Sequence, residues 1–267
     1  MGGQSNHRRH RRGGTLMLAA FMVLTLALTG GCATSPHPAN AEAVAEFNAL
    51  NDPGEPANRA VFEVNRGLDA AFLKPVALAY RDITPQFFQD RIKAVLDNLR
   101  APVIFFNDML QGELERAVAT VLRFVLNSSL GILGLNDIAT DMGIEGHDED
   151  FGQTLAVWGI PEGPYVMLPL FGPSNPRDAI GMVVDFLIDP FNTWAGNTDR
   201  DFAVFSRSAA RGVDLRATYM ETLDDLEKSS LDFYAAIRSL YRQRRVNEIN
   251  NGDPSAKLPV INIGTVP

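Results

Sequence analysis

Cysteine and histidine are the scarcest reactive residues in this chain. One cysteine, Cys32, occurs in 267 residues, so no intrachain disulfide can form. Of the four histidines, His7 and His10 lie in a basic N-terminal stretch and His37 follows Cys32 closely, which leaves His147 for the rest of the chain. A Ser-His-Asp or Cys-His site, or a zinc site, would therefore have to use His147.

Motifs of common enzyme classes are also missing. The sequence has no Gly-x-Ser-x-Gly, no phosphate-binding glycine loop and no His-Glu-x-x-His, which argues against a conventional hydrolase. Positive charge is scarce as well. Residues 1–31 hold four of the 24 basic residues and none of the 32 acidic ones, so the remainder carries a net charge of −12. Because phosphates repel such a chain, we expect no nucleic-acid binding.

The longest apolar run is too short to cross a membrane. It covers Thr15–Leu28, whereas a transmembrane helix needs roughly 18 apolar residues or more. The basic stretch His7–Arg12 precedes it and the small residues Gly30-Gly31 follow it. This order of basic, apolar and small residues predicts a secretory signal peptide over residues 1–31.

Cys32 stands where a lipoprotein carries its acylated cysteine. The match to a bacterial lipobox is imperfect, because Thr29 occupies the position where leucine is preferred. We predict lipidation of Cys32, since an unpaired cysteine in an exported protein needs an explanation; ordinary signal cleavage is the alternative. Ala33 follows in place of the aspartate that often retains lipoproteins in the inner membrane, and this favours the outer membrane. Residues 32–50 are then a flexible tether.

Helical periodicity dominates the sequence from Asn51 onward. Thr84-Pro85 and Asn175-Pro176 each combine an N-cap residue with a proline at the first helical position. Strand patterns are weak, so we predict an all-α single domain over residues 51–246 and a partly disordered tail over 247–267. The apolar stripes include Ala57, Val61, Val64, Leu68 and Phe72; Leu114, Ala117, Val118, Val121, Leu122 and Val125; and Ala179, Ile180, Val183, Val184, Leu187 and Ile188.

Two short segments have alternative interpretations. Tyr165–Phe171, the best candidate for extended structure, is interpreted as a buried irregular segment, and the alternative is a segment lying in lipid or lining an apolar path. The run His147-Asp148-Glu149-Asp150 looks like a metal cluster. Consecutive residues cannot all face one ion, so we interpret it as a solvated acidic loop.

Four blocks of polar, glycine and proline residues stand out. The first runs from Asn51 to Asn65, the second from Asn98 to Gly112, the third from Arg123 to Gly131, and the fourth from Glu149 to Asp178. In this order they resemble the MlaA (VacJ) family of outer-membrane lipoproteins. The resemblance covers roughly residues 51–241, and the imperfect lipobox and the C-terminal tail lie outside it.

The resemblance implies a function without cofactor, metal or covalent chemistry. Members of that family maintain lipid asymmetry in Gram-negative bacteria by taking phospholipids from the outer leaflet toward a periplasmic carrier. The implied architecture is a ring of many short amphipathic helices, with long C-terminal helices, around an amphipathic channel in the inner leaflet. The implied partners are phospholipids, trimeric porins and the periplasmic lipid-carrier protein, and the implied location is the periplasmic face of the outer membrane.

Two sets of residues could serve such a lipid path. Asn58, Arg59, Asn65 and Arg66 could form a polar channel wall, since an unpaired polar headgroup in hydrocarbon costs several kcal/mol. The alternative is that they cap the first helix and pair locally.

A loop within the fourth block could gate the path. Glycines free its backbone and prolines fix its corners, which predicts a hinged loop, and a static turn is the alternative. The candidate gating residues are Trp158, Gly159, Ile160, Pro161, Gly163, Pro164 and Tyr165.

Two other functions remain open. A structural outer-membrane lipoprotein could bind porins without moving lipid. A phospholipase-like enzyme would need a nucleophile and a base, and His147 is the available base.

Overall fold

The structure, a computed structural model, describes residues 50–252. Cys32, the signal peptide, the tether up to residue 49 and the tail from residue 253 lie outside the described residues. The helical part extends slightly further than predicted, because the last helix continues to Ile249. In chain order the elements are α3 (Glu55–Leu68), the π-helical η1 (Asp69–Leu73), α4 (Lys74–Ile83), α5 (Gln86–Gln111), α6 (Leu114–Ser129), α7 (Ile138–Asp141), α8 (Phe151–Val157), β1 (Val166–Leu168), β2 (Gly172–Ser174), α9 (Pro176–Ile188), α10 (Pro190–Asn197), α11 (Asp201–Thr218), α12 (Met220–Ser229) and α13 (Phe233–Ile249).

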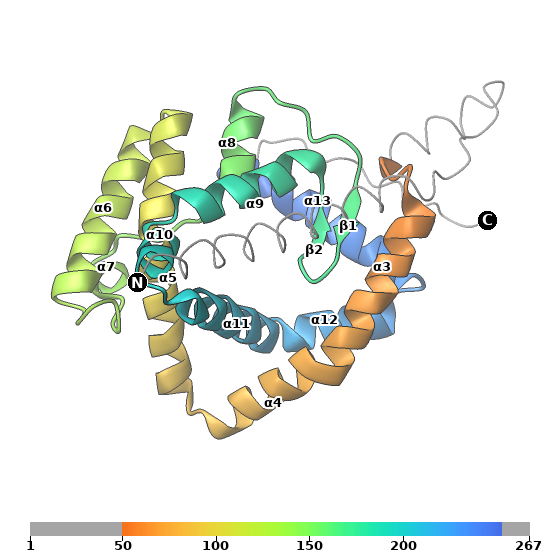
Figure 1. The fold of residues 1–267 in the computed structure, drawn as a ribbon, viewed down its shortest axis with the longest axis horizontal. Coiled ribbons are helices and arrows are strands. Elements are labelled where there is room, and N and C mark those ends of the chain that lie inside the picture. Colours follow the sequence, from red (N-terminus) through yellow and green to blue (C-terminus); the bar gives the residue numbers. More distant parts are fainter. Residues whose placement is uncertain (1–49, 253–267) are drawn as a thin grey trace, which may run out of the picture.

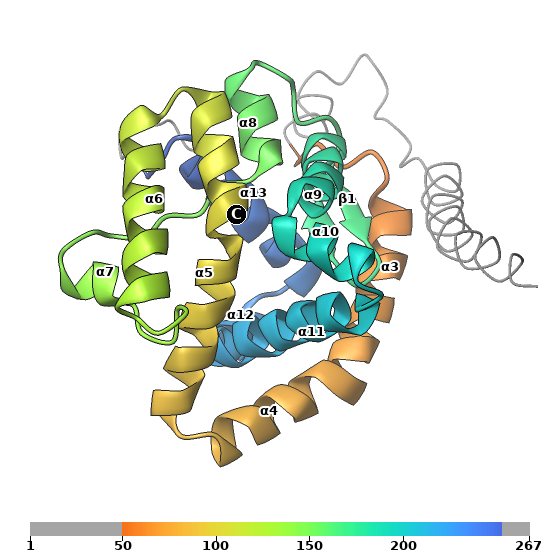
Figure 2. The same ribbon diagram turned by 60° about the vertical axis from the view of Figure 1, so that its left-hand side comes forward.

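The helices follow one another around a closed outline, so the predicted all-α, ring-like class is confirmed (Figure 1). Helix α4 joins α3 to α5 at one end, and α11 lies along α4. Turning the molecule shows α5 and α6 side by side, with α7 at their end (Figure 2). Gly112, at φ 81°, ends α5 in a left-handed conformation that glycine adopts without strain, and α6 then runs back along α5.

The two predicted helix starts have different outcomes. Asn175 caps α9 as predicted, because its side chain accepts a hydrogen bond from the N–H of Asp178. The prediction at Thr84 is wrong by one residue: Thr84 is extended, Pro85 takes the N-cap position and α5 begins at Gln86. The Thr84 carbonyl instead accepts a hydrogen bond from the Gln89 amide, which fixes this corner by another contact.

The segment Tyr165–Phe171 forms a hairpin rather than an irregular segment. Strands β1 and β2 pair antiparallel, with Val166 opposite Ser174 and Leu168 opposite Gly172. The burial prediction holds for one end only, because Tyr165 and Met167 are buried whereas Leu170 and Phe171 at the turn are exposed. Pairing between the two strands satisfies backbone groups that a single extended segment would leave open.

A small aromatic core fastens the hairpin between α3 and α13. Phe62 of α3, Tyr165 and Met167 of the hairpin and Tyr234 of α13 are buried together. The Phe62 and Tyr234 rings meet edge to face, with centroids 5.5 Å apart, an arrangement that favours aromatic pairs. Elsewhere α8 and α9 approach so closely that a Cβ on Gly181 would lie 2.3 Å from the backbone nitrogen of Gly152.

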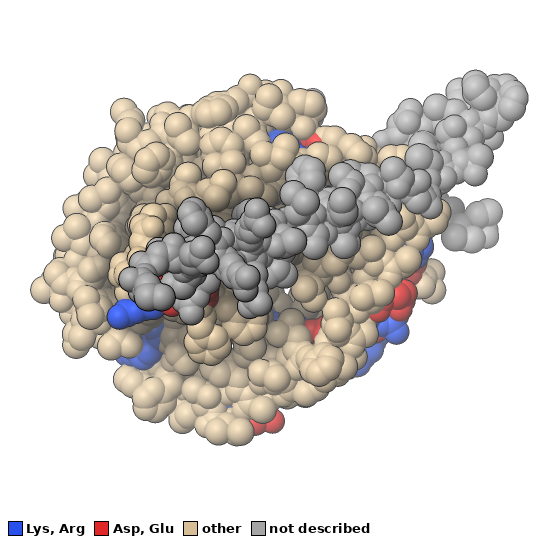
Figure 3. Space-filling model, viewed as in Figure 1, with Lys and Arg blue, Asp and Glu red and all other residues tan. Residues whose placement is uncertain are grey.

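Polar side chains are unusually prominent in the interior. Among residues 50–252, 19 polar or charged side chains are buried against 15 apolar ones, and the largest fully buried side chains are all polar. Large apolar side chains lie outside instead: Val118 and Val125 of α6 and Leu133 of the following turn are more than half exposed. Figure 3 shows few charged atoms on the uncovered part of one face. Such broad exposed apolar surface marks contact with membrane or protein.

None of the helices between residues 50 and 252 is long and apolar enough to span a bilayer.

Candidate functional site: a charged cavity between helices

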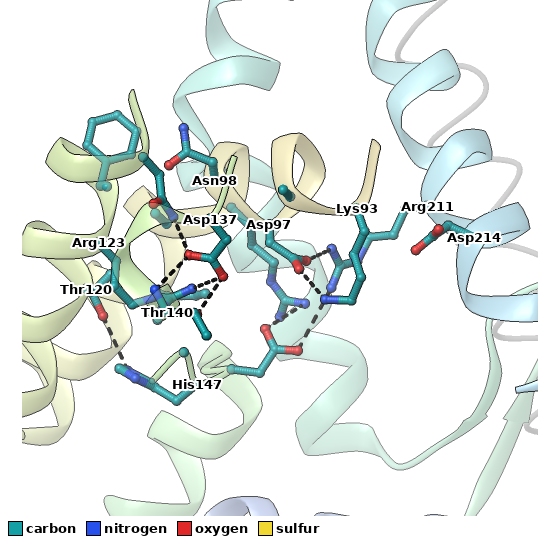
Figure 4. Close-up of a pocket in the computed structure, with 18 of the residues that line it drawn as sticks. Lys93, Asp97, Asn98, Thr120, Arg123, Asp137, Thr140, His147, Arg211 and Asp214 are labelled. Carbon is teal, nitrogen blue, oxygen red and sulfur yellow. Dashed lines mark hydrogen bonds and ion pairs between the residues drawn. The ribbon is translucent and has the colours of Figure 1, made fainter. Parts of the chain in front are cut away.

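A cavity of about 530 Å³ lies between α5, α6, α11 and the end of α13 (Figure 4). Apolar residues such as Ile104, Phe124 and Leu215 share its wall with many charged side chains. This mixture of apolar and charged lining suits an amphipathic ligand. The charged lining residues are Lys93, Asp97, Arg100, Arg123, Asp137, Asp148, Arg211, Asp214 and Arg244.

A chain of alternating charges crosses the cavity wall. Lys93 Nζ lies 2.6 Å from Asp97 Oδ2, and Asp97 Oδ1 lies 3.0 Å from Arg211 Nη1. Arg211 Nη2 is 3.9 Å from Asp148 Oδ2, and Asp148 Oδ1 is 3.3 Å from Arg100 Nη1. Residues 93, 97 and 100 lie on one face of α5, and Arg211 of α11 packs against that face. The spacing along α5 therefore places these charges in a row. Figure 4 shows Lys93 and Asp97 of α5 meeting Arg211 of α11.

A second polar group holds α6 against α7. Arg123 donates to Asp137 Oδ2 at 2.8 Å and to Thr140 Oγ1 at 2.9 Å, and Asp137 also caps α7. Burial disfavours the charged form of Asp137, yet hydrogen bonds from Thr140, Asn127 and Arg123 lower its pKa below the usual value. The carboxylate is therefore held ionised and fully occupied by its neighbours.

His147 makes a compact buried contact with Asp108 and Thr120. Its Nε2 lies 2.9 Å from Asp108 Oδ1 and 3.3 Å from Thr120 Oγ1, while the Thr120 hydroxyl also lies 2.7 Å from Asp108 Oδ2. A nucleophile–base–acid relay needs the two ring nitrogens to face different partners. Here one nitrogen faces both groups, so this geometry does not build a phospholipase-like relay.

The acidic run beside His147 is solvated only at Asp148, so the solvated-loop interpretation is wrong for Glu149 and Asp150. Glu149 is only 1% exposed and binds Arg116 at 2.6 Å and Gln111 at 2.8 Å. Asp150 caps α8 and binds Arg245, and the three carboxylates of the run face three different partners. Tertiary partners, which sequence neighbours do not reveal, cover their charge. Within residues 50–252, no group of three metal-ligating side chains is suited to an ion.

The candidate polar-wall asparagines contact the hairpin. Asn58, buried on α3, donates to Asp52 Oδ1 and the Tyr165 carbonyl, and its Oδ1 accepts from the Met167 N–H at 2.9 Å. Asn65 bridges in the same way, donating to the Leu168 carbonyl and accepting from the Leu170 N–H in the turn. These contacts dock the edge of β1 on α3.

The candidate polar-wall arginines pair locally. Arg59 binds Glu55 and Asp232, and Arg66 lies within 3.3 Å of Glu63. Arg59 also lies over the Tyr234 ring. All four polar-wall residues lie away from the lining of the 530 Å³ cavity, so their part in a lipid path stays a prediction.

Hydrogen bonds hold the candidate gating loop at both of its ends. Asn51 donates to the Gly163 carbonyl at 2.7 Å and to Glu162 at 3.0 Å, and Tyr165 is buried. Gly159, at φ 85°, has open space beside its α-carbon. The half-exposed Trp158 donates its indole N–H to the Leu110 carbonyl, and gating itself stays a prediction.

The cavity residues were missed as a site at the sequence level, although a signal exists. Lys93, Asp97 and Arg100 follow at i, i+4 and i+7, which puts them on one helix face, and Arg100 belongs to the second block. The partner cation Arg211 lies 114 residues from Asp97, so only the tertiary structure pairs them.

A protein-family model described as MlaA lipoprotein matches residues 50–248, which span the described helices and the cavity. The chain belongs to the MlaA lipoprotein family. The match thus confirms the resemblance carried by the four sequence blocks.

Named relatives agree with this family. The Escherichia coli protein "Intermembrane phospholipid transport system lipoprotein MlaA" is 30% identical over 246 residues, covering 89% of this chain and 90% of the relative. An uncharacterised protein of Rickettsia typhi is 35% identical over 198 residues, covering 73% and 77%. A solved chain described under "Structural basis for maintenance of bacterial outer membrane lipid asymmetry" superposes with a TM-score of 0.65 at 33% identity, covering 73% of this chain and 96% of that chain.

Proposed function

We propose that this MlaA-family chain is an outer-membrane lipoprotein that removes mislocalised phospholipids from the outer leaflet and passes them to a periplasmic carrier. The observation that carries the proposal is a charged cavity between helices, several of which, such as α6 and α9, expose large apolar side chains. A phospholipid has the same two requirements, because its headgroup needs polar partners and its acyl chains need apolar surface. The related E. coli protein is named for intermembrane phospholipid transport.

The exposed apolar side chains support a position in the membrane. Phe72, Phe205 and Leu187 are exposed on three different helices, a pattern that costs free energy in water and little in lipid. We place the chain at the periplasmic face of the outer membrane of a Gram-negative bacterium, anchored through an acylated Cys32. The exposed apolar surface would add a second attachment to the acylated cysteine, and two such signals together anchor a protein stably.

The proposed partners suit the same function. The family resemblance implies a trimeric porin and a periplasmic lipid-carrier protein as neighbours, which suits a lipid that enters from the outer leaflet and leaves through the periplasm. No enzymatic step is needed, and the single-nitrogen contact of His147 supports transport rather than hydrolysis. The alternative is a scaffold that binds porins and moves no lipid.

Outer-leaflet phospholipid in a deletion strain separates these functions. We expect surface phospholipid to rise on deletion and to fall when the wild-type chain is restored. A Cys32→Ala variant is the anchoring control and should fail to restore it. Surface phospholipid that never rises would contradict transport and favour the scaffold, whereas rescue by Cys32→Ala would contradict the anchor alone.

The loop from Trp158 to Tyr165 is proposed as the gate of the lipid path. Asn51 and Glu162, whose side chains meet at 3.0 Å, give a position for a lock. We expect an Asn51→Cys/Glu162→Cys pair to reduce lipid clearance when oxidised and to restore it after reduction. Equal clearance in the two states would show that the loop is a static turn.

A further inference from the structure

Asp214 is the unpaired carboxylate of the cavity. It projects from α11 toward the other labelled side chains and is 8% exposed (Figure 4). Its hydrogen-bond partner is the Tyr80 hydroxyl, which lies 3.3 Å from Oδ1. Across residues 50–252, no lysine, arginine or histidine nitrogen lies within 4.0 Å of this carboxylate. Lys93 and Arg211 act on Asp214 only from beyond this distance, and a buried charge without a direct ion pair is costly unless a ligand supplies one.

The cations of the cavity already have partners. Lys93 and Arg211 share Asp97, and Arg100 binds Asp148. The remaining two pairs are Arg123 with Asp137 and Arg244 with Glu248. Lys93, Arg100 and Arg211 thus share two carboxylates, which leaves one positive charge in excess at this wall, whereas Asp214 has no ion pair within 4.0 Å.

Asn98 adds a polar side chain to the wall and donates to Ser128 Oγ at 3.0 Å. Its Oδ1 is buried and not open to a ligand. The carboxylate of Asp214, which has no ion pair, fits a ligand that brings hydrogen-bond donors and positive charge.

We propose that the cavity selects phospholipids whose headgroup carries an ammonium group, and that Asp214 binds this ammonium. The inference rests on the proposed transport function and names its substrate class. The headgroup phosphate would lie on the side of Lys93 and Arg211, which share one carboxylate between two cations. A zwitterionic headgroup thus matches both ends of the charge pattern.

Headgroups without an amine fit the same wall poorly. A phosphatidylglycerol headgroup brings a phosphate but no cation, so Asp214 stays unpaired and the added negative charge meets a carboxylate. Burial already raises the pKa of Asp214, while the Tyr80 hydrogen bond and the nearby Lys93 lower it. An ammonium would stabilise the ionised form further.

The test measures which lipids the protein takes up. Full-length, detergent-solubilised lipoprotein is incubated with mixed micelles of equal phosphatidylethanolamine, phosphatidylcholine and phosphatidylglycerol, repurified, and its bound lipid quantified by mass spectrometry. We expect the two ammonium lipids to exceed phosphatidylglycerol by about tenfold, which corresponds to about 1.4 kcal/mol, because contacts with charged groups are among the stronger ones in proteins.

Four variants locate the effect. Asp214→Asn should bring the lipid ratio near that of the micelles, and Asp214→Glu should restore selection. Asp225→Asn is the matched control, since it removes the same charge from an exposed position on α12 and should leave the ratio unchanged. Asp97→Asn should raise phosphatidylglycerol uptake, because it frees Lys93 and Arg211.

Each result has one meaning. Selection that is unchanged in a folded Asp214→Asn variant, or wild-type protein that takes up the three lipids equally, overturns the headgroup assignment and leaves transport standing. Wild-type protein that takes up no phospholipid contradicts the proposed function itself. Tight binding of soluble ethanolamine phosphate without acyl chains would overturn the assignment of the site to a lipid.

Discussion

The two faces of α9 differ strongly in polarity and in exposure. Ile180, Val183 and Leu187 point outward and are more than half exposed. Arg177 and Asp178 point inward and are buried, where Asp178 binds Arg245. The helix is amphipathic in the usual way, but its apolar face is the exposed one.

The same reversal occurs at α6 and α11, whereas α12 exposes charged residues such as Glu221 and Asp225. Outward residues of α6 and α11 are apolar, while Asp108, Glu149 and Asp178 are buried inside with charged or hydrogen-bonding partners. In water such a distribution would expose apolar surface and bury charge, and both cost free energy. Surrounded by lipid, the exposed surface is stabilised, and the interior is free to present polar groups to a headgroup. The following changes test this contrast.

The largest effect is expected from breaking the interior charge network. Arg245, with 10% of its side chain exposed, binds Asp150, Asp178 and Glu248. Arg245→Ala would leave Asp150 without an ion pair and the buried Asp178 with Arg177 alone, and should lower the free energy of unfolding by about 3–5 kcal/mol. Denaturation of the detergent-solubilised protein, followed by circular dichroism, measures this.

The neighbouring arginine is the control for that change. Arg244 pairs with Glu248 but its side chain is 59% exposed, so Arg244→Ala should cost less than about 1 kcal/mol. Equal losses in the two variants would mean that the interior network is no more important than a surface pair.

A charge placed on the exposed apolar face of α9 tests whether this face contacts lipid. Val183→Asp puts a carboxylate where we place lipid, and insertion of an aspartate into hydrocarbon costs about 2.5–3.5 kcal/mol. We expect the variant to lose co-flotation with vesicles while keeping its helical content. Val183→Ala should float as the wild type does, and full flotation of Val183→Asp would refute lipid contact at α9.

A partly buried carboxylate on α9, Asp185, gives a pH effect. Burial raises the pKa of Asp185 to about 6, against the opposing hydrogen bonds from Asn107 and the Phe151 N–H. The folded state therefore favours the protonated form. The stabilisation is complete below about pH 4, where the unfolded carboxyl titrates, and is lost as the pH rises through 6.

Asp185→Asn should remove this part of the pH dependence. We compare how far the free energy of unfolding falls between pH 4 and pH 7. We expect this fall to be about 2 kcal/mol smaller in the variant than in the wild type. Parallel curves for the two proteins would show that Asp185 titrates alike in the folded and unfolded states.

The smallest effect is expected from a change that loosens the β1–β2 hairpin. Asn65→Ala removes the hydrogen bonds to the Leu168 carbonyl and from the Leu170 N–H, at a cost of about 1 kcal/mol. Faster hydrogen exchange at the Leu170 amide is the direct measurement. Arg66→Ala, one residue further along α3, should not change that amide, and unchanged exchange in Asn65→Ala would remove the docking role.

Local signals in the sequence predicted much of the fold. The Asn175-Pro176 cap and the apolar stripes placed α6 and α9 correctly, because capping and helical periodicity act over four to eight residues. The same rules placed the start of α5 one residue early, since Thr84 is extended and α5 starts without a threonine cap.

Features that depend on distant partners could not be predicted. The run from His147 to Asp150 looks solvated until Arg116 and Arg245 are brought to it from two other helices. The pairing of β1 with β2 was not predicted, because the strands are short and the segment contains a proline. The cavity was not predicted, because its row of ion pairs joins α5 to α11, which lie more than 100 residues apart in the sequence.

The sequence by itself determined where the helices lie, to which family the chain belongs and which faces are apolar, because each of these depends on neighbouring residues. The tertiary structure alone decided that the apolar faces point outward and that Asp214 remains unpaired beside five paired cations. Burial and ion pairing are set by residues far apart in the chain, and one-dimensional spacing does not contain those distances.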